Sequence, residues 1–237
     1  MVKLTLAILL AFHALLGAAN QPTQSLKILL DPGHSLASPG ALGVRAVHEV
    51  YYNNIFTTEL AHALEAAGFR VLLTRLPDEE ISLDKRAEIA NSSDADLFLS
   101  IHHDSAQVRY LESITVDGKP AWRSRIPIQG YSVFVSSMNS HFDKSLLFAK
   151  AIAQHLYALG RKPTLHHAEK ITGESRELLD SRLGIYRFDE LLVLRKANIP
   201  AVLLEIGVIV DMQDESYISS KPNRAAMINA IVKSLKN

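Results

Sequence analysis

Three apolar segments of this chain lead into side chains that bind metals or transfer protons. Ile28–Leu30 leads into a tight Pro-Gly turn that is followed by His34, and similar apolar runs precede His102 and Glu205. Short apolar runs of this kind are typical of buried strands in parallel sheets. Because ligands bind beyond the carboxyl ends of such strands, we expect the three side chains to meet at one edge of a sheet.

These residue types are suited to a hydrolytic zinc centre, which takes three nitrogen or oxygen ligands and keeps one open position for water. His34 and His102 supply two nitrogens, and Glu49 supplies an oxygen from the turn into the first expected helix. Glu205 is then free to act as the general base. Zinc lowers the pKa of its bound water to about 7, and a nearby carboxylate completes the deprotonation. Attack of the resulting hydroxide on a carbonyl gives amide hydrolysis.

Each candidate also has a structural interpretation. A single histidine at a strand end often has only a structural role, and Glu49 could simply favour a helix N-terminus electrostatically. Glu205 is harder to explain in this way, because a carboxylate inside a buried strand is costly unless it is paired or used. Taken together, the histidines, Glu49 and Glu205 favour a metal site more strongly than any one of them does alone.

The residues around His102 leave the choice of ligand open at this point. Consecutive strand residues point to opposite faces, so His102 and His103 are not expected to bind one metal together. Asp104 shares a face with His102 and could orient its ring, as carboxylates do for metal-bound histidines. His48, next to Glu49, is a competing ligand candidate.

The elements that must position these residues alternate between strand and helix. This alternation predicts a single α/β domain with a mainly parallel twisted sheet and helices on both faces. Ser82 is placed to cap the second helix, and Pro222 lies at the start of the last one. The expected strands are 27–31, 69–74, 97–101, 131–135 and 200–206, and the expected helices are 49–67, 83–91, 141–159 and 223–235.

Two stretches do not fit the alternation, and we interpret both as long loops. Residues 105–130 contain a turn signal at Asp117-Gly118 and the single tryptophan, Trp122, which could stack on a sugar or fix a hairpin. Residues 160–190 are charged and include His166-His167, which we expect to be surface residues.

Composition limits the function and the compartment. The 237-residue chain has a formal net charge of zero, so nothing in it favours binding to nucleic acid. It contains no cysteine, which excludes disulfides, thiolate ligands and a lipidated N-terminal cysteine. Any metal must therefore be held by histidine and carboxylate.

The N-terminus has the pattern of a signal peptide. Lys3 precedes the apolar run Leu4–Leu16, and the small residues Gly17–Ala19 follow. The run is shorter than the roughly 20 residues that span a bilayer. We expect residues 1–19 to be removed, leaving an exported protein, periplasmic or extracellular, that is soluble and has no stable membrane span.

Several short motifs occur in a fixed order along residues 26–236, which we take as one catalytic domain. They are Asp31-Pro32-Gly33-His34, Glu49, Thr74-Arg75, Arg86 with Ala90-Asn91, Ala95-Asp96 before Ser100-Ile101-His102, and Pro200–Gly207. Together they resemble the catalytic domain of zinc-dependent N-acetylmuramoyl-L-alanine amidases of the amidase-3 type. The resemblance implies cleavage of the amide that joins N-acetylmuramic acid to L-alanine in peptidoglycan or its fragments.

Carried over by position, the resemblance implies that His34, Glu49 and His102 are zinc ligands and that Glu205 is the catalytic glutamate. It also favours His102 over His103. The chain departs from the family after each motif, at His103-Asp104-Ser105 and after Gly207, which affects substrate preference more than catalysis. The alternatives are a zinc peptidase or deacetylase acting on another cell-wall amide and a non-catalytic peptidoglycan-binding domain.

The resemblance also raises the question of regulation. Some members of the family carry an inserted helix whose glutamate blocks the zinc until a partner protein removes it. Glu169, Glu174 and Glu177 lie in roughly the matching place. A solvated loop is the simpler expectation for this segment, and the hypothesis is that one of these residues occupies the open metal position at rest.

Overall fold

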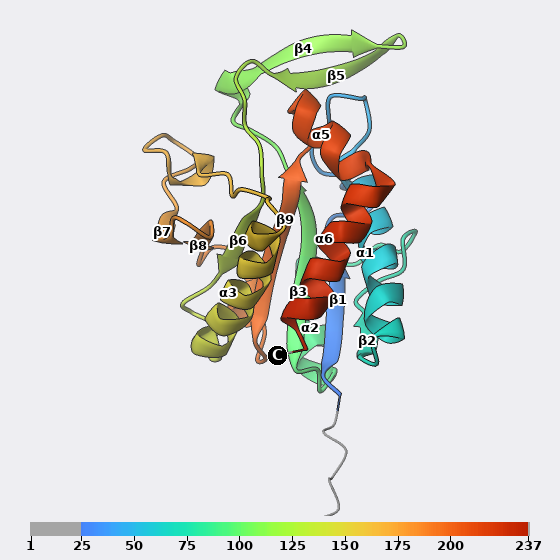
Figure 1. The fold of residues 1–237 in the computed structure, drawn as a ribbon, viewed down its shortest axis with the longest axis vertical. Coiled ribbons are helices and arrows are strands. Elements are labelled where there is room, and N and C mark those ends of the chain that lie inside the picture. The colour runs from blue at the N-terminus through green and yellow to red at the C-terminus, as the bar shows by residue number, and fades with distance from the viewer. Residues whose placement is uncertain (1–24, 237) are drawn as a thin grey trace, which may run out of the picture.

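A seven-stranded mixed sheet forms the centre of the molecule. The computed structural model describes residues 25–236, so the predicted signal peptide lies outside the described residues. In order across the sheet the strands are β2 (Arg70–Leu73), β1 (Lys27–Pro32), β3 (Leu97–Asp104), β9 (Ala201–Val208), β6 (Ser132–Val135), β8 (Ile185–Arg187) and β7 (Glu177–Asp180). The four strands β2, β1, β3 and β9 are parallel, β6 is antiparallel to β9, β8 is parallel to β6, and β7 is antiparallel to β8 (Figure 1).

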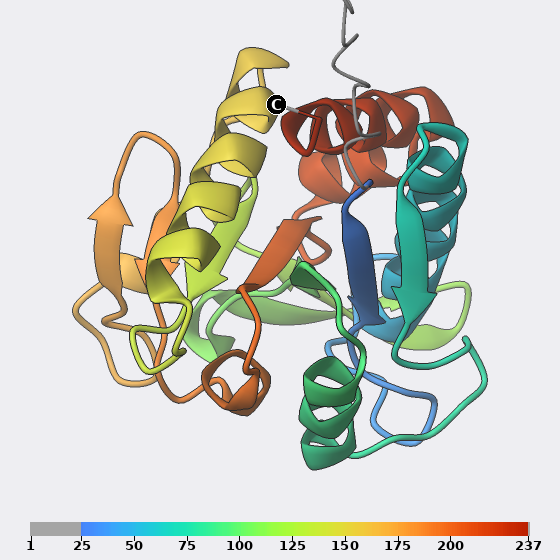
Figure 2. The ribbon, with the colours of Figure 1, turned by 90° about the horizontal axis from the view of Figure 1, so that it is seen from below.

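Helices cover both faces of this sheet, as Figure 2 shows along the strands. One face packs against α1 (Glu49–Ala66), α3 (Phe142–Ala158) and α6 (Lys221–Ser234), and the other packs against α2 (Leu83–Ser92) and α4 (Leu192–Lys196). The predicted fold class, a mainly parallel α/β sheet covered on both faces, is confirmed. None of the described helices is long and apolar enough to cross a membrane.

Side chains along β3 show how the strands supply both cores. Leu97, Leu99 and Ile101 pack into the core of α1, α3 and α6, whereas Phe98 packs into the core of α2 and α4. Because strand residues alternate between faces, His102 lies on the face of α2 and α4 and His103 lies on the face of α1.

The local signals at the helix ends are confirmed where the sequence provides them. The Ser82 side chain accepts a hydrogen bond from the Lys85 backbone N–H and caps α2. Gly68, directly after the C-cap of α1, adopts φ +92°, which a glycine tolerates without strain. Pro222 lies in the first turn of α6.

The two stretches interpreted as long loops are more ordered than expected. Residues 105–130 include the hairpin of β4 (Leu111–Val116) and β5 (Lys119–Ser124), which turns at Asp117-Gly118 beyond the carboxyl end of β9 (Figure 1). In the second stretch, β7 and β8 pair and extend the edge of the sheet. Neither hairpin belongs to the helix–strand alternation, so the periodicity of the sequence did not indicate them. The helix α5 (Met212–Ser219), capped by Asp211, was also not predicted.

Candidate metal centre

The three predicted metal ligands lie together beyond the carboxyl ends of β1 and β3. The Glu49 carboxylate lies between two imidazoles: its Oε2 is 2.9 Å from His34 Nε2, and its Oε1 is 3.1 Å from His102 Nδ1. One donor atom from each residue lies within 4.8 Å of the others. We call these three residues the first cluster. It combines a strand end, the first residue of a helix and a second strand, as the sequence predicted.

A strained turn after β1 places His34. Its backbone adopts φ +61°, in the left-handed region that non-glycine residues rarely occupy and that costs about 1–3 kcal/mol. The Glu49 carboxylate holds its ring. Gly33 precedes it, and a Cβ there would lie 2.3 Å from the His102 ring. The glycine is therefore needed for the two histidines to approach each other.

Two buried arginines hold the backbone of this turn. Arg86 donates from Nη1 to the Pro32 carbonyl (2.7 Å) and from Nη2 to the His34 carbonyl (2.6 Å). Arg75 donates to the carbonyls of Pro32 (3.1 Å) and Gly33 (3.0 Å). Three successive carbonyls are thus paired away from water, which stabilises the strained conformation.

Arg86 is in turn neutralised by Asp31 on β1. Its Nη1 donates to Asp31 Oδ1 at 2.5 Å, and the hydroxyls of Thr74 (2.6 Å) and Ser100 (2.8 Å) donate to the same carboxylate. Removing one partner of a buried ion pair is strongly destabilising, because it leaves the other charge buried and uncompensated. The motif residues Asp31, Thr74, Arg75 and Arg86 therefore have a structural role beneath the first cluster.

The charge of Glu49 is stabilised by its neighbours. Burial would raise its pKa, but hydrogen bonds with His102 and His34 hold that pKa far below the usual range. Burial also acts to lower the pKa of His34, yet the hydrogen bond and charge of Glu49 raise it above its ordinary value. A carboxylate with two imidazoles is a donor set that zinc takes. Gly40 leaves room for it, since a Cβ there would lie 2.5 Å from Glu49 Oε2.

Asn53 and His103 support Glu49 from the α1 side. Asn53 Nδ2 donates to Glu49 Oε1 (3.2 Å), and Asn53 Oδ1 accepts from His103 Nδ1 (2.8 Å). Burial lowers the pKa of His103 to about 3, so its ring is neutral. The prediction that His102 and His103 face opposite ways is confirmed. His48 precedes α1 and is not a member of the first cluster.

Glu205 lies on β9 directly opposite His102 in the parallel register. Paired residues on neighbouring parallel strands are about 4.8 Å apart and share a face, so the two side chains project into the same space. Its Oε2 is buried and, among the described residues, has no hydrogen-bond partner. Burial and then the charges of Asp104 and Glu49 raise its pKa well above the ordinary value.

Asp104 does not orient His102, so this prediction is wrong. A register irregularity between His102 and Asp104 interrupts the pairing of β3 with β9. The Asp104 carboxylate lies instead 2.8 Å from His167 Nε2 and 3.6 Å from His166 Nε2. We call Asp104, His166 and His167 the second cluster.

The expectation that His166 and His167 are surface residues is also wrong. Their side chains are only 5% and 14% exposed. Burial would lower the pKa of His167, but Asp104 and Glu174 raise it to about 10. The charged composition of residues 160–190 gave no indication that these two histidines are buried.

The glutamates of this segment pair with other residues. Glu169 accepts a hydrogen bond from Tyr110 Oη (2.6 Å), and Glu177 forms an ion pair with Arg187 (2.6 Å). Glu174 contacts the second cluster through His167 Nδ1 (3.0 Å). The hypothesis that one of them blocks the first cluster is therefore not supported by this conformation.

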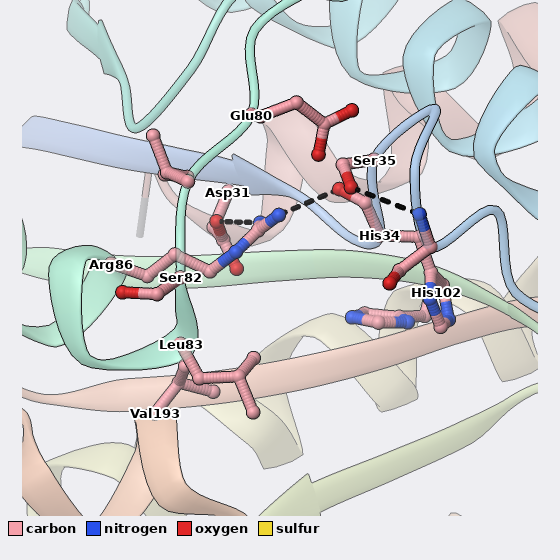
Figure 3. A pocket seen from close by; sticks show the side chains of 11 residues that line it. Asp31, His34, Ser35, Glu80, Ser82, Leu83, Arg86, His102 and Val193 are labelled. Atoms are coloured by element: carbon pink, nitrogen blue, oxygen red, sulfur yellow. Dashed lines mark hydrogen bonds and ion pairs between the residues drawn. The ribbon is translucent and has the colours of Figure 1, made fainter.

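A cavity of about 550 Å³ opens beside the first cluster (Figure 3). His34 and His102 form one wall, Arg86 and Asp31 form its polar base, and residues at the start of α2 and Val193 of α4 complete it. A mixed polar and apolar lining is suited to a substrate with sugar and peptide parts. Trp122, 39% exposed on β5, is outside this lining, and its two interpretations remain predictions.

Sequence reasoning missed the residues that support the first cluster. Asn53 is four residues after Glu49 and so shares its helix face, which is a usable signal. The carbonyl-binding roles of Arg75 and Arg86 have no such signal, because they depend on long-range contacts with the turn after β1.

Comparison with known proteins assigns the family. The profile of a family described as N-acetylmuramoyl-L-alanine amidase matches residues 28–237. A probable N-acetylmuramoyl-L-alanine amidase, AmiB of Haemophilus influenzae, is 30% identical over 233 residues, covering 89% of this chain and 51% of the relative. A probable cell wall amidase, LytH of Staphylococcus epidermidis, is 30% identical over 220 residues, covering 92% and 60%. The chain therefore spans about half to three fifths of these relatives.

Solved structures share the fold. The amidase Ami1 of Mycobacterium abscessus superposes with a TM-score of 0.69 at 24% identity, covering 89% of this chain and 97% of that one. The CwlD amidase of Clostridioides difficile, solved in complex with the GerS lipoprotein, gives a TM-score of 0.66 at 21% identity, covering 90% and 97%. With the profile match across nearly the whole described sequence, the chain belongs to the N-acetylmuramoyl-L-alanine amidase family.

Proposed function

We propose that this protein is a zinc-dependent hydrolase of the amide bond between N-acetylmuramic acid and L-alanine in peptidoglycan or its fragments. The observation that carries the proposal is the first cluster, with Glu205 opposite His102 on the neighbouring strand. Family membership supplies the substrate class.

His34, Glu49 and His102 would hold the zinc ion. When bound, zinc supplies Lewis acidity, which lowers the pKa of water and polarises the carbonyl of the amide. The buried arginine network beneath the cluster fixes the His34 backbone, and Asn53 fixes the Glu49 carboxylate. These supports keep the donors preorganised, which favours metal affinity.

Glu205 would move the proton. A general base works best when its pKa lies near the working pH, and burial with neighbouring carboxylates shifts the pKa of Glu205 in that direction. Its unpartnered Oε2 is free to accept a proton from water. The same carboxyl can then donate that proton to the leaving amine of L-alanine.

The compartment and partners belong to the same proposal. Residues 1–19 would direct export and residues 26–236 would form the catalytic domain, acting in the periplasm or outside the cell. The relatives called cell wall amidases support an exported enzyme. The GerS complex of the CwlD amidase suggests that a protein partner could act on this chain as an activator.

Mass spectrometry of digested sacculi and of purified muropeptides tests the activity. We expect free peptide stems that begin with L-alanine, no such products after treatment with a chelator, and recovery after zinc is added back. Cleavage within the stem would instead support a peptidase, and released acetate a deacetylase. Binding to sacculi without metal-dependent hydrolysis would support a non-catalytic domain.

A further inference from the structure

The second cluster has the composition of a metal site that is separate from the first. We propose that Asp104, His166 and His167 bind a second divalent cation, of the zinc-like class that takes imidazole and carboxylate ligands. One donor atom from each residue lies within 4.8 Å of the others. The inference concerns metal binding and does not depend on the reaction proposed above.

The residues of the second cluster are largely buried. The three side chains are 5–14% exposed. His166 Nε2 is buried and, among the described residues, accepts or donates no hydrogen bond. A buried polar nitrogen without a partner is unfavourable. A cation held between the Nε2 atoms and Asp104 would give this nitrogen a partner.

The outer nitrogens of both histidines are already engaged. His167 Nδ1 lies 3.0 Å from Glu174 Oε2, and Gln107 Nε2 donates to the other oxygen of that carboxylate (2.8 Å). His166 Nδ1 lies 2.8 Å from Thr164 Oγ1. Metal-binding histidines characteristically use the second nitrogen in this way, and a carboxylate behind the ring raises its basicity. With the proton of each ring on Nδ1, both Nε2 atoms would be available to a cation beside Asp104.

The supports of the cluster are fixed to the sheet. The Thr164 backbone N–H donates to the Tyr131 carbonyl (2.9 Å), and Tyr186 Oη donates to the Thr164 carbonyl (2.9 Å). Asp104 Oδ1 accepts from the Ser105 N–H (2.8 Å), which leaves Oδ2 for the histidines. The arrangement is therefore preorganised from both sides.

A buried ion pair is the competing interpretation of the same contacts. A protonated His167 paired with Asp104 would explain one of the two imidazoles, at 2.8 Å. It leaves His166 Nε2 at 3.6 Å from the carboxylate, beyond hydrogen-bond distance. Only a cation uses all three donors.

The location indicates what the cation would do. Between α3 and β7, residues 159–176 contain only a short helical turn at His166–Ala168. A metal that joins this turn to Asp104 on β3 would link segments about 60 positions apart in the chain and hold the connection against the sheet. The second cation is thus a structural tether next to the site.

Zinc counting on the full chain tests the proposal. We expect two zinc ions per chain by mass spectrometry after equilibrium dialysis, one in His34→Asn and one in His167→Asn. His62→Asn is the matched control, because this histidine is exposed on α1, and it should keep two. One zinc in the wild type with none in His34→Asn, or two in His167→Asn, would overturn the proposal.

Thermal unfolding gives a second readout that does not need activity. Ligands that bind the native state raise the melting temperature. Zinc should still raise the melting temperature of His34→Asn. It should not raise the melting temperature of the double variant His34→Asn/His167→Asn. Equal zinc-induced shifts in His34→Asn and the double variant, with circular dichroism showing both folded, would contradict a second site.

Discussion

The two clusters use the same chemical groups in different surroundings. Each has one carboxylate and two imidazoles, and each includes a residue of β3. In the first, the histidine side chains are 31% and 19% exposed and line the cavity. In the second they are 5% and 14% exposed and lie under the connection between α3 and β7. Accessible ligands are typical of a catalytic metal site, and buried ligands are typical of a structural metal site.

Glu205 relates the two clusters. The charges of Asp104, from the second cluster, and Glu49, from the first, both raise its pKa. Because a cation favours the ionised form of a nearby carboxyl, occupancy of either cluster would favour the base form of Glu205. The two clusters thus differ in access to substrate, but both affect the pKa of Glu205.

The largest effect is expected for Glu205→Gln, which isolates the catalytic cluster. The amide has the same shape but cannot accept a proton, so the rate of muropeptide hydrolysis should fall by about two to four orders of magnitude. Zinc content should stay at the wild-type value. Wild-type turnover in this variant would remove Glu205 from the mechanism.

Asn53→Ala tests the support of the first cluster alone. Loss of the hydrogen bond to Glu49 should weaken zinc binding there by about 10- to 100-fold, the usual range for such supporting residues. Competition with a chromophoric chelator measures this affinity. Thr58→Ala, at an exposed position of α1, serves as the control for zinc affinity at the first cluster. An unchanged affinity in Asn53→Ala would show that Glu49 needs no such support.

The pH dependence of stability tests the buried neutral His103. Its folded pKa of about 3 lies below the ordinary 6.5, so the unfolded chain binds a proton that the folded chain does not. The contribution of His103 to the stability of the metal-free protein should therefore fall as the pH drops below 6.5. Between pH 7 and pH 5 this group costs about 2 kcal/mol.

Denaturant titrations of wild type and His103→Gln at both pH values measure that difference. His34 and His167 have raised pKa values, so their contributions to stability change in the opposite direction over this window, but both residues are present in wild type and variant and cancel in the difference. Equal changes in stability between pH 7 and pH 5 in the two proteins would mean that His103 does not titrate on unfolding.

Thr164→Val should have the smallest effect and concerns only the second cluster. The valine keeps the shape but removes the hydroxyl beside His166 Nδ1, so zinc affinity there should fall by about tenfold or less, the size of one neutral hydrogen bond. Isothermal titration in the His34→Asn background isolates this site. A matching loss at the first cluster, measured in the His167→Asn background, would show that the two sites are not separate.

Much of the first cluster could be predicted because its residues are at the ends of regular elements. The apolar runs before His34 and His102 locate the strands, and parallel strands bring their carboxyl ends to one edge. The second cluster could not be predicted. Asp104 follows an irregularity in β3, and His166 and His167 lie in a segment without periodicity.

The sequence by itself determined the alternation of strands and helices, the edge at which His34, Glu49, His102 and Glu205 meet, and a ligand chemistry limited to nitrogen and oxygen by the absence of cysteine. Those features follow from local pattern and composition. Tertiary structure alone decided that two arginines hold the strained His34 turn and that a charged connection buries two histidines against Asp104. Such contacts join residues far apart in the chain, and no local preference encodes them.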